Sequence, residues 1–446
     1  MKNKEYWLKA IKIAWPSVLE SFFLALAVII DTIMVSRLGP SAVAAVGLTN
    51  QPKFIGLTAF FSINVAISAI VARRKGQGKR KEAHETLLTG FILSVILCII
   101  ITSIFLFKSD KILELAGSNP DTHVKSKEYL DIIMGFSIFS VISMCINAAQ
   151  RGCGNTKIAF YTNLISSLVN VVFNYLLIEG NLGAPRLEIK GAAIATILGT
   201  VVASIISFSS LFSKKSYLSA HFIIEKKIKA KARSLITITK IGLNMFVENI
   251  FMRVGFLATA LLAAGLGTDE FAAYNVGLNY LSLGFAFADG MQVASVALTG
   301  ESLGEGNKEK ALLYSSICQR IGLIISIVLS TFLFIFGKDL FKLYFKEEHI
   351  IEYGVIICRF IMIIVLLQIS QIIYGGTLRA AGDIKYTLFS TILAVTFIRT
   401  IVTYILVKIM GLGIVGIWLG ILSDQFSRFV FLSLRYRSKK WLDMKI

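Results

Sequence analysis

The sequence predicts an all-α polytopic membrane protein with twelve transmembrane helices in two parallel six-helix lobes. Three observations predict this fold class: the apolar composition, a series of long apolar segments, and an internal repeat. Of the 446 residues, 55% are hydrophobic and only 16% are charged, and the mean hydropathy is +0.73. A soluble domain carries about 25% charged residues, and disordered chains have low hydrophobicity. The composition therefore excludes a water-soluble enzyme and a disordered chain.

The apolar segments are long enough to cross a bilayer, because a transmembrane helix needs about 20 apolar residues. In hydrocarbon, only helices and closed barrels satisfy the backbone, and segments of this length and hydrophobicity are not barrel strands. We therefore expect helices at residues 15–38, 52–72, 87–107, 129–150, 158–180, 191–213, 236–266, 271–300, 312–337, 354–378, 386–408 and 413–434.

Basic residues gather in the N-terminal segment, in the loops after the second and sixth spans, and in the C-terminal tail. The net charge of +19 would suggest nucleic acid for a soluble protein, but here the cations flank apolar spans. An even number of spans places all four basic regions on one side, which the positive-inside rule identifies as cytoplasmic. We expect a multi-pass protein of the cell inner (cytoplasmic) membrane with both termini cytoplasmic. Its partner is the lipid bilayer, not nucleic acid.

An internal repeat relates positions 228 residues apart along the chain. Glu20 matches Glu248, and a glycine-containing turn recurs at 76–78 and 304–306. The spacing Arg-x-x-Gly-x-x-Lys, which begins at Arg151, recurs at Arg379. We therefore expect an N-lobe at 1–218 with helices 1–6, an interlobe linker core at 219–228, and a C-lobe at 229–446 with helices 7–12. Because six is even, the repeat is parallel, an architecture that serves alternating access.

Charged residues inside the spans are candidates for function, because each costs about 2.5–3.5 kcal/mol at the bilayer centre. Asp31 has apolar residues on both sides and no cation one turn away. It needs a partner across helices, a bound cation or a proton. Asp424 and Arg428 are spaced i, i+4 and are interpreted as a structural pair. The other candidates are Glu20, Glu248, Arg253, Asp289 and Arg399.

Two amides in the fifth span, Asn170 and Asn174, are also spaced i, i+4 and share one helix face. Beside a carboxylate, their oxygen atoms would suit a hard cation such as Na⁺. The same amides would equally serve as hydrogen-bonding contacts between helices. The residues alone leave both interpretations open.

The sequence resembles the multidrug and toxic compound extrusion (MATE) transporters, with a NorM-like pattern, over essentially the whole chain. The resemblance rests on motifs that occur in order in both halves. They are Pro16-x-x-x-Glu20, Asp31-Thr-Ile-Met-Val-Ser-Arg-Leu-Gly39, Ala44-Ala-Val-Gly-Leu48, Gly191-Ala-Ala-Ile-Ala-Thr196, Gly265-Leu-Gly267 with Ala272-Ala273, and Gly376-Thr-Leu-Arg-Ala-Ala-Gly-Asp383.

The resemblance implies a MATE-type fold and antiport, in which small organic cations leave while Na⁺ or H⁺ enters. Coupling of the ion or proton would then fall on Asp31, Asn170, Asn174 and Thr196, with Na⁺ expected at Asp31, Asn170 and Asn174. A substrate site or second cation site would involve Glu20, Glu248, Asp289, Gln368 and Arg399. The family's second acid in the C-lobe site corresponds to Gln368, so that site is expected to be incomplete unless Asp289 compensates.

The resemblance gives no reason to expect a cofactor beyond the coupling ion, and we expect a monomer that is not an enzyme. A lipid-linked precursor flippase of the same superfamily is the main alternative, although such proteins usually have fourteen spans and a more cationic cleft. A membrane-embedded enzyme would need a clustered His, Asp or Ser site at the membrane edge, and the sequence presents none. A passive channel would need no driving ion.

Overall fold

The computed structural model describes residues 2–38, 40–116, 118, 120–213 and 216–444. These residues form helices and turns and contain no β-strand. Eleven helices are long and apolar enough to cross a membrane, or twelve if one bent pair counts as a single span. The predicted all-α polytopic fold is therefore confirmed. Gly39, which ends the motif that begins at Asp31, lies outside the described residues.

The chain forms two compact units, and the division falls inside two long helices, α1 (Lys2–Ser36) and α9 (Ala232–Ala264). The first unit, Leu19–Leu243, holds most of α1 and the start of α9. The helices between them are α2 (Pro40–Gly76), α3 (Arg80–Leu115), α4 (Pro120–Gly135), α5 (Ser137–Gly152), α6 (Thr156–Leu177), η1 (Asn181–Gly183), α7 (Glu188–Ser210) and α8 (Ala220–Glu225).

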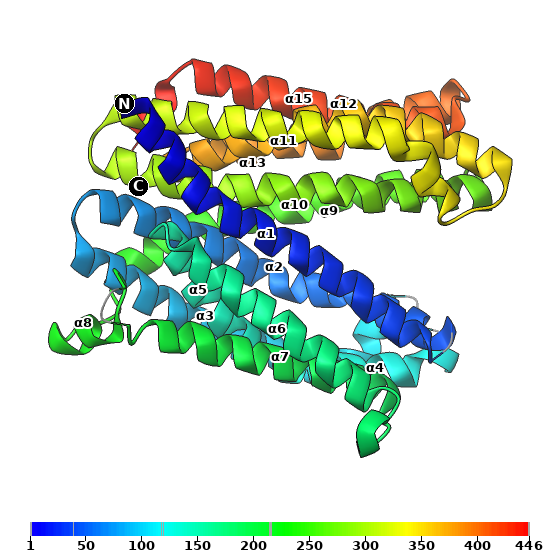
Figure 1. Ribbon diagram of the computed structural model, residues 1–446, viewed down its shortest axis with the longest axis horizontal. Coiled ribbons are helices and arrows are strands. Elements are labelled where there is room, and N and C mark those ends of the chain that lie inside the picture. Colours follow the sequence, from blue (N-terminus) through cyan, green and yellow to red (C-terminus); the bar gives the residue numbers. More distant parts are fainter. Residues whose placement is uncertain (1, 39, 117, 119, 214–215, 445–446) are drawn as a thin grey trace. The chain divides into compact units, whose positions relative to one another are not determined.

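The second unit contains the chain up to Val18 and from Asn244 onward. In Figure 1 its long helices α10 (Thr268–Gly304), α11 (Lys308–Lys342) and α12 (Glu348–Ala381) lie side by side. They are followed by α13 (Ile384–Thr391), η2 (Ile392–Arg399), α14 (Thr400–Tyr404), η3 (Ile405–Ile409), α15 (Gly413–Arg437) and η4 (Lys440–Asp443). The lobe boundaries at 218 and 229 come from the repeat in the sequence and stay a prediction.

Matching turns appear at matching places in the two repeats. Gly78, between α2 and α3, has φ of 70°, and Gly306, between α10 and α11, has φ of 77°. Gly154 and Gly382, which end α5 and α12, have φ of 79° and 95°. Positive φ favours glycine because it has no Cβ. The glycines that repeat in the sequence thus mark turns that repeat in the structure.

Several helices differ from the predicted spans. Helix α1 begins at Lys2 instead of residue 15, and α2 begins at Pro40 instead of residue 52, so that Pro16 and Pro52 lie inside helices. The predicted span 129–150 is the bent pair α4 and α5, which meet at 46°. The predicted span 386–408 contains two π-helical segments, η2 and η3.

The predicted linker, with the residues just before it, is anchored to the beginning of α3. The backbone N–H of Ser219 donates to Nε2 of His84 over 3.0 Å, and Arg80 donates to the carbonyl of Tyr217 over 2.9 Å. The Ser219 hydroxyl accepts from the N–H of Phe222 and caps α8. The start of the linker thus packs within the first unit.

Candidate coupling site and its counterpart in the second unit

The first unit places a carboxylate that forms no salt bridge among the described residues against two amides. Asp31 of α1 is half-buried, and Asn174 of α6 donates a hydrogen bond to its Oδ1. Asn174 is fully buried, and its Oδ1 atom has no hydrogen-bond partner among the described residues. An oxygen that is buried beside a carboxylate without a donor is suited to a cation or an ordered water.

The second amide links Asp31 to helix α7. Asn170 satisfies all its polar contacts when its nitrogen donates to Asp31 Oδ1 over 2.8 Å and its oxygen accepts from Thr196 Oγ1 over 3.2 Å. Helix α7 can approach α6 here because Gly199 has no side chain: a Cβ there would lie 2.7 Å from the carbonyl oxygen of Ser166. The sequence-predicted set Asp31, Asn170, Asn174 and Thr196 therefore comes together.

Two further residues of this site were missed by the sequence analysis. Tyr129 of α4 is buried and its side chain is hydrogen-bonded to Thr196. Lys53 of α2 interacts electrostatically with Asp31. The sequence analysis began the second span at residue 52, which placed Lys53 at a helix end, whereas α2 begins at Pro40. A lysine thirteen residues into an apolar helix was the signal that could have found it.

Glu20 does not join Asp31. It is buried, and it accepts hydrogen bonds from Arg151 of α5 and Asn163 of α6. Arg151 neutralises the charge of this carboxylate inside the first unit. The pair was not predicted, although both residues recur in the repeat.

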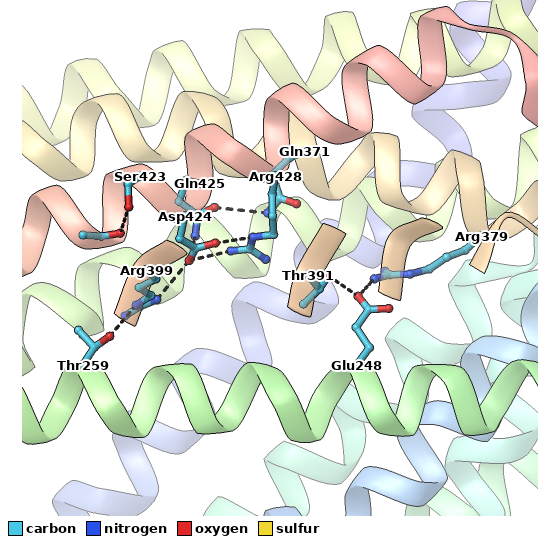
Figure 2. A network of polar contacts seen from close by, with 11 residues as sticks. Glu248, Thr259, Gln371, Arg379, Thr391, Arg399, Ser423, Asp424, Gln425 and Arg428 are labelled. Atoms are coloured by element: carbon cyan, nitrogen blue, oxygen red, sulfur yellow. Dashed lines mark hydrogen bonds and ion pairs between the residues drawn. The ribbon is translucent and has the colours of Figure 1, made fainter. Parts of the chain in front are cut away.

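Glu248 forms the same arrangement in the second unit. Its Oε1 accepts from Arg379 of α12 over 2.5 Å and from Thr391 of α13 over 2.9 Å. Figure 2 shows both side chains directed at Glu248 on α9. Arginine and glutamate are 131 residues apart in both units, and the third partner is 143 residues from the glutamate in both. Each repeat therefore carries one copy of a Glu–Arg pair.

Arg399 and Asp424 form a third network, also visible in Figure 2. Arg399 Nη1 lies 3.3 Å from Asp424 Oδ2, and its Nε donates to Thr259 Oγ1 over 2.8 Å. Arg428 donates to both oxygens of Asp424, over 2.7 and 3.2 Å. The i, i+4 pair that the sequence predicted is present, and Arg399 adds a second guanidinium to it. Asp424 and Thr259 are fully buried, and Arg399 is 3% exposed.

The five residues predicted for a substrate or second cation site are not gathered by these contacts. Glu20 belongs to the first unit, Glu248 binds Arg379, and Arg399 binds Asp424. Gln368 of α12 is fully buried against Gly284, and neither its Oε1 nor its Nε2 has a hydrogen-bond partner in the described part of the chain. Asp289 is exposed on α10. The role of these residues stays a prediction.

Known proteins resemble the chain over nearly its whole length. The MatE family model matches residues 16–176 and 245–405. A relative named "Probable multidrug resistance protein NorM" from Thermotoga maritima is 26% identical over 435 residues, covering 97% of this chain and 92% of the relative. A relative of the same name from Idiomarina loihiensis is 25% identical and covers 98% of this chain and 95% of the relative.

A solved structure described as the outward-facing conformation of a multidrug resistance MATE family transporter of the MOP superfamily has 25% sequence identity. Its TM-score is 0.89, with 98% of this chain and 97% of that chain covered. The family model matches well over half of the sequence, once in each repeat. The chain therefore belongs to the MatE family of membrane transporters.

Proposed function

We propose that the protein exports lipophilic organic cations or drugs in exchange for Na⁺ or H⁺, by alternating access of its two lobes, and that Asp31 is the coupling residue. The relatives named as multidrug resistance proteins support the substrate class, because they match over nearly the full length. No bound cofactor is required in this proposal beyond the coupling ion.

One observation carries the assignment of Asp31. Glu20, Glu248 and Asp424 each bind an arginine side chain directly. Asp31 is instead hydrogen-bonded by neutral amides. An arginine is always charged and neutralises a buried carboxylate permanently, whereas amides leave the negative charge in place. Asp31 is therefore suited to exchange one cation for another.

The atoms around Asp31 fit a proton or a hard cation. The site offers the carboxylate, the Oδ1 atom of Asn174 and the hydroxyl of Thr196, and Na⁺ prefers oxygen ligands of this kind. The other ion, H⁺, would neutralise Asp31 by protonating it. In both cases the loaded state loses the negative charge that attracts a cationic substrate. Coupling then follows from the difference in affinity between the two states.

We also propose that the protein is a monomer in the cell inner membrane with both termini in the cytoplasm. The four basic regions support this orientation, because cytoplasmic loops carry an excess of Lys and Arg.

The proposed antiport is tested by efflux of a fluorescent lipophilic cation from proteoliposomes, under a Na⁺ gradient and separately under a pH gradient. We expect wild type to respond to one gradient and Asp31→Asn to lose that response, while Asp339→Asn, which changes an exposed carboxylate on α11 and is reconstituted to the same level, retains it. The effective gradient names the ion. Unimpaired gradient-driven transport by Asp31→Asn would contradict the assignment.

A lipid-linked precursor flippase is the second candidate function. It is favoured by the arginine pairing of Glu20, Glu248 and Asp424, which leaves fewer acids to attract a cation. Absence of cation efflux under both gradients, together with movement of a fluorescent lipid-linked sugar, would select this alternative.

A further inference from the structure

The Arg399–Asp424 network occupies the place in the second repeat that the Asp31 site occupies in the first. The Glu–Arg pairs fix the correspondence between the repeats, because they relate Glu20 to Glu248 and Asn163 to Thr391 with one offset of 228 residues. The same offset carries Asp31 to Thr259 on α9 and Thr196 to Asp424 on α15. The acid and the hydroxyl have thus exchanged places between the repeats.

The remaining positions correspond after one extra residue. Asn170 lies 229 residues before Arg399, so the offset grows by one between Thr391 and Arg399, and it returns to 228 between Arg399 and Asp424. The π-helical segment η2, Ile392–Arg399, lies between these positions, and a π-turn accommodates one residue more than an α-helical turn. The added residue has a structural cause, and Arg399 is the counterpart of Asn170.

The contacts follow the same plan in both units. In the first, Asn170 bridges Asp31 on α1 and Thr196 on α7. In the second, Arg399 bridges Thr259 on α9 and Asp424 on α15, as Figure 2 shows. The close approach of α9 to η2 depends on Gly255, where a Cβ would lie 2.3 Å from the carbonyl oxygen of Val395. The two networks therefore have the same connections, but the bridging residue is neutral in the first unit and positively charged in the second.

We propose that Arg399 is a covalently attached cation that closes a latent ion site in the second repeat, so that only the first repeat exchanges ions. This inference rests on the proposed ion coupling at Asp31. A tethered group competes at an effective concentration of about millimolar or higher, and a guanidinium does not lose its proton. A free Na⁺ or H⁺ therefore cannot replace Arg399 at Asp424, whereas Asp31 has no such arginine.

The role of Arg399 is tested by the reaction of individual carboxyl groups with dicyclohexylcarbodiimide. The carboxyls of Asp31 and Asp424 are compared in wild type. A further carboxyl is introduced at position 259 of the second repeat, where the first repeat has Asp31. This reagent modifies protonated carboxyl groups in apolar sites, and peptide mass spectrometry reads each position without substrate or gradient. In wild type, we expect Asp31 to react at least about tenfold faster than Asp424, because two guanidiniums bind Asp424 directly whereas Asp31 is bonded by neutral amides.

Three variants isolate Arg399. In Thr259→Asp, we expect slow modification at position 259, because Arg399 pairs with the introduced carboxylate. In Thr259→Asp with Arg399→Asn, we expect a reaction as fast as that of Asp31, within about threefold. The matched control, Thr259→Asp with Arg399→Lys, keeps a tethered cation and should react slowly again. Equal rates at position 259 in the three variants would overturn the proposal.

The comparison of Asp31 with Asp424 uses the wild-type protein, so it does not depend on whether a variant folds. If Asp424 reacts as fast as Asp31, the proposal is also overturned. Slow reaction at both carboxyls would instead count against coupling at Asp31. In that case the variants at position 259 still decide the role of Arg399. Failure of the inference and failure of the proposed antiport are therefore distinguishable.

Discussion

The two repeats share their Glu–Arg pairs and differ at the positions of Asp31 and Asp424. At Glu20 and Glu248 the partners, the spacing and the helices correspond, which is typical of a structural contact retained in both repeats. In the first repeat, two amides are hydrogen-bonded to Asp31. In the second repeat, two guanidiniums bind Asp424. The comparison teaches that a buried carboxylate is available for exchange where no arginine binds it directly, as at Asp31, and is closed where arginine does, as at Asp424.

The largest expected effect is the loss of stability in Asp424→Asn compared with Asp31→Asn. Asp424→Asn leaves two buried guanidiniums without their counter-charge, and breaking a buried ion pair costs about 3–5 kcal/mol. Asp31→Asn keeps a side chain of the same shape beside neutral amides and should cost less than about 1 kcal/mol. Thermal unfolding of both variants in detergent checks this, and equal losses of stability would remove the distinction.

The Glu–Arg pairs should behave alike because their contacts correspond. We expect Arg151→Gln and Arg379→Gln each to lose about 2 kcal/mol, because each leaves a buried glutamate without its cation. The exchange Glu248→Arg with Arg379→Glu should recover part of the loss. Melting temperatures of the single and double variants measure the coupling, and losses that differ strongly between the two arginines would break the symmetry.

Gly154→Ala and Gly382→Ala test whether the turns are equivalent. Both glycines have positive φ, which costs a residue with a Cβ about 1–2 kcal/mol. We expect similar decreases in melting temperature from the two variants. A tolerated alanine at one position only would show that the two turns carry different strain.

The smallest effect is expected at Lys53, which has no ionisable counterpart at position 281 in the second repeat. Its positive charge interacts with Asp31, so under the proposed coupling it competes with the coupling cation. Lys53→Met should therefore raise the apparent affinity for that cation by about threefold to tenfold, corresponding to about 1 kcal/mol. The half-saturating ion concentration in the efflux assay measures the shift. The control Lys53→Arg keeps the charge and should leave the concentration unchanged, and weaker ion affinity in Lys53→Met would contradict the competition.

Much of the fold could be predicted because hydropathy and the repeat are properties of the sequence itself. The i, i+4 spacing placed Asn170 and Asn174 on one helix face, and the family resemblance placed Asp31 and Thr196 beside them, as the structure has them. The arginine partners of Glu20 and Glu248 are each 131 residues away in the sequence, so predicting them required knowledge of which helices are in contact. Those pairs could have been found, because glutamate and arginine recur together in both repeats.

Other features had weaker signals. The bend between α4 and α5 falls at Phe136, and no proline marks it in the sequence. The π-helical segment η2 leaves only one trace in the sequence, a change of one residue in the 228-residue offset between the repeats. The matches that established this offset all lie outside η2, so they did not reveal the change. The correspondence of Arg399 with Asn170 therefore required the structure.

The central claim, that a coupling ion and a cationic substrate compete through Asp31, is tested most directly by linkage of their binding. Binding of a fluorescent lipophilic cation to the purified protein would be titrated over a range of Na⁺ concentrations and over a range of pH. We expect one ion to weaken substrate binding in wild type by about 5- to 150-fold, and Asp31→Asn to abolish this dependence while the control Asp339→Asn retains it. The same ion dependence in Asp31→Asn as in wild type would contradict the account.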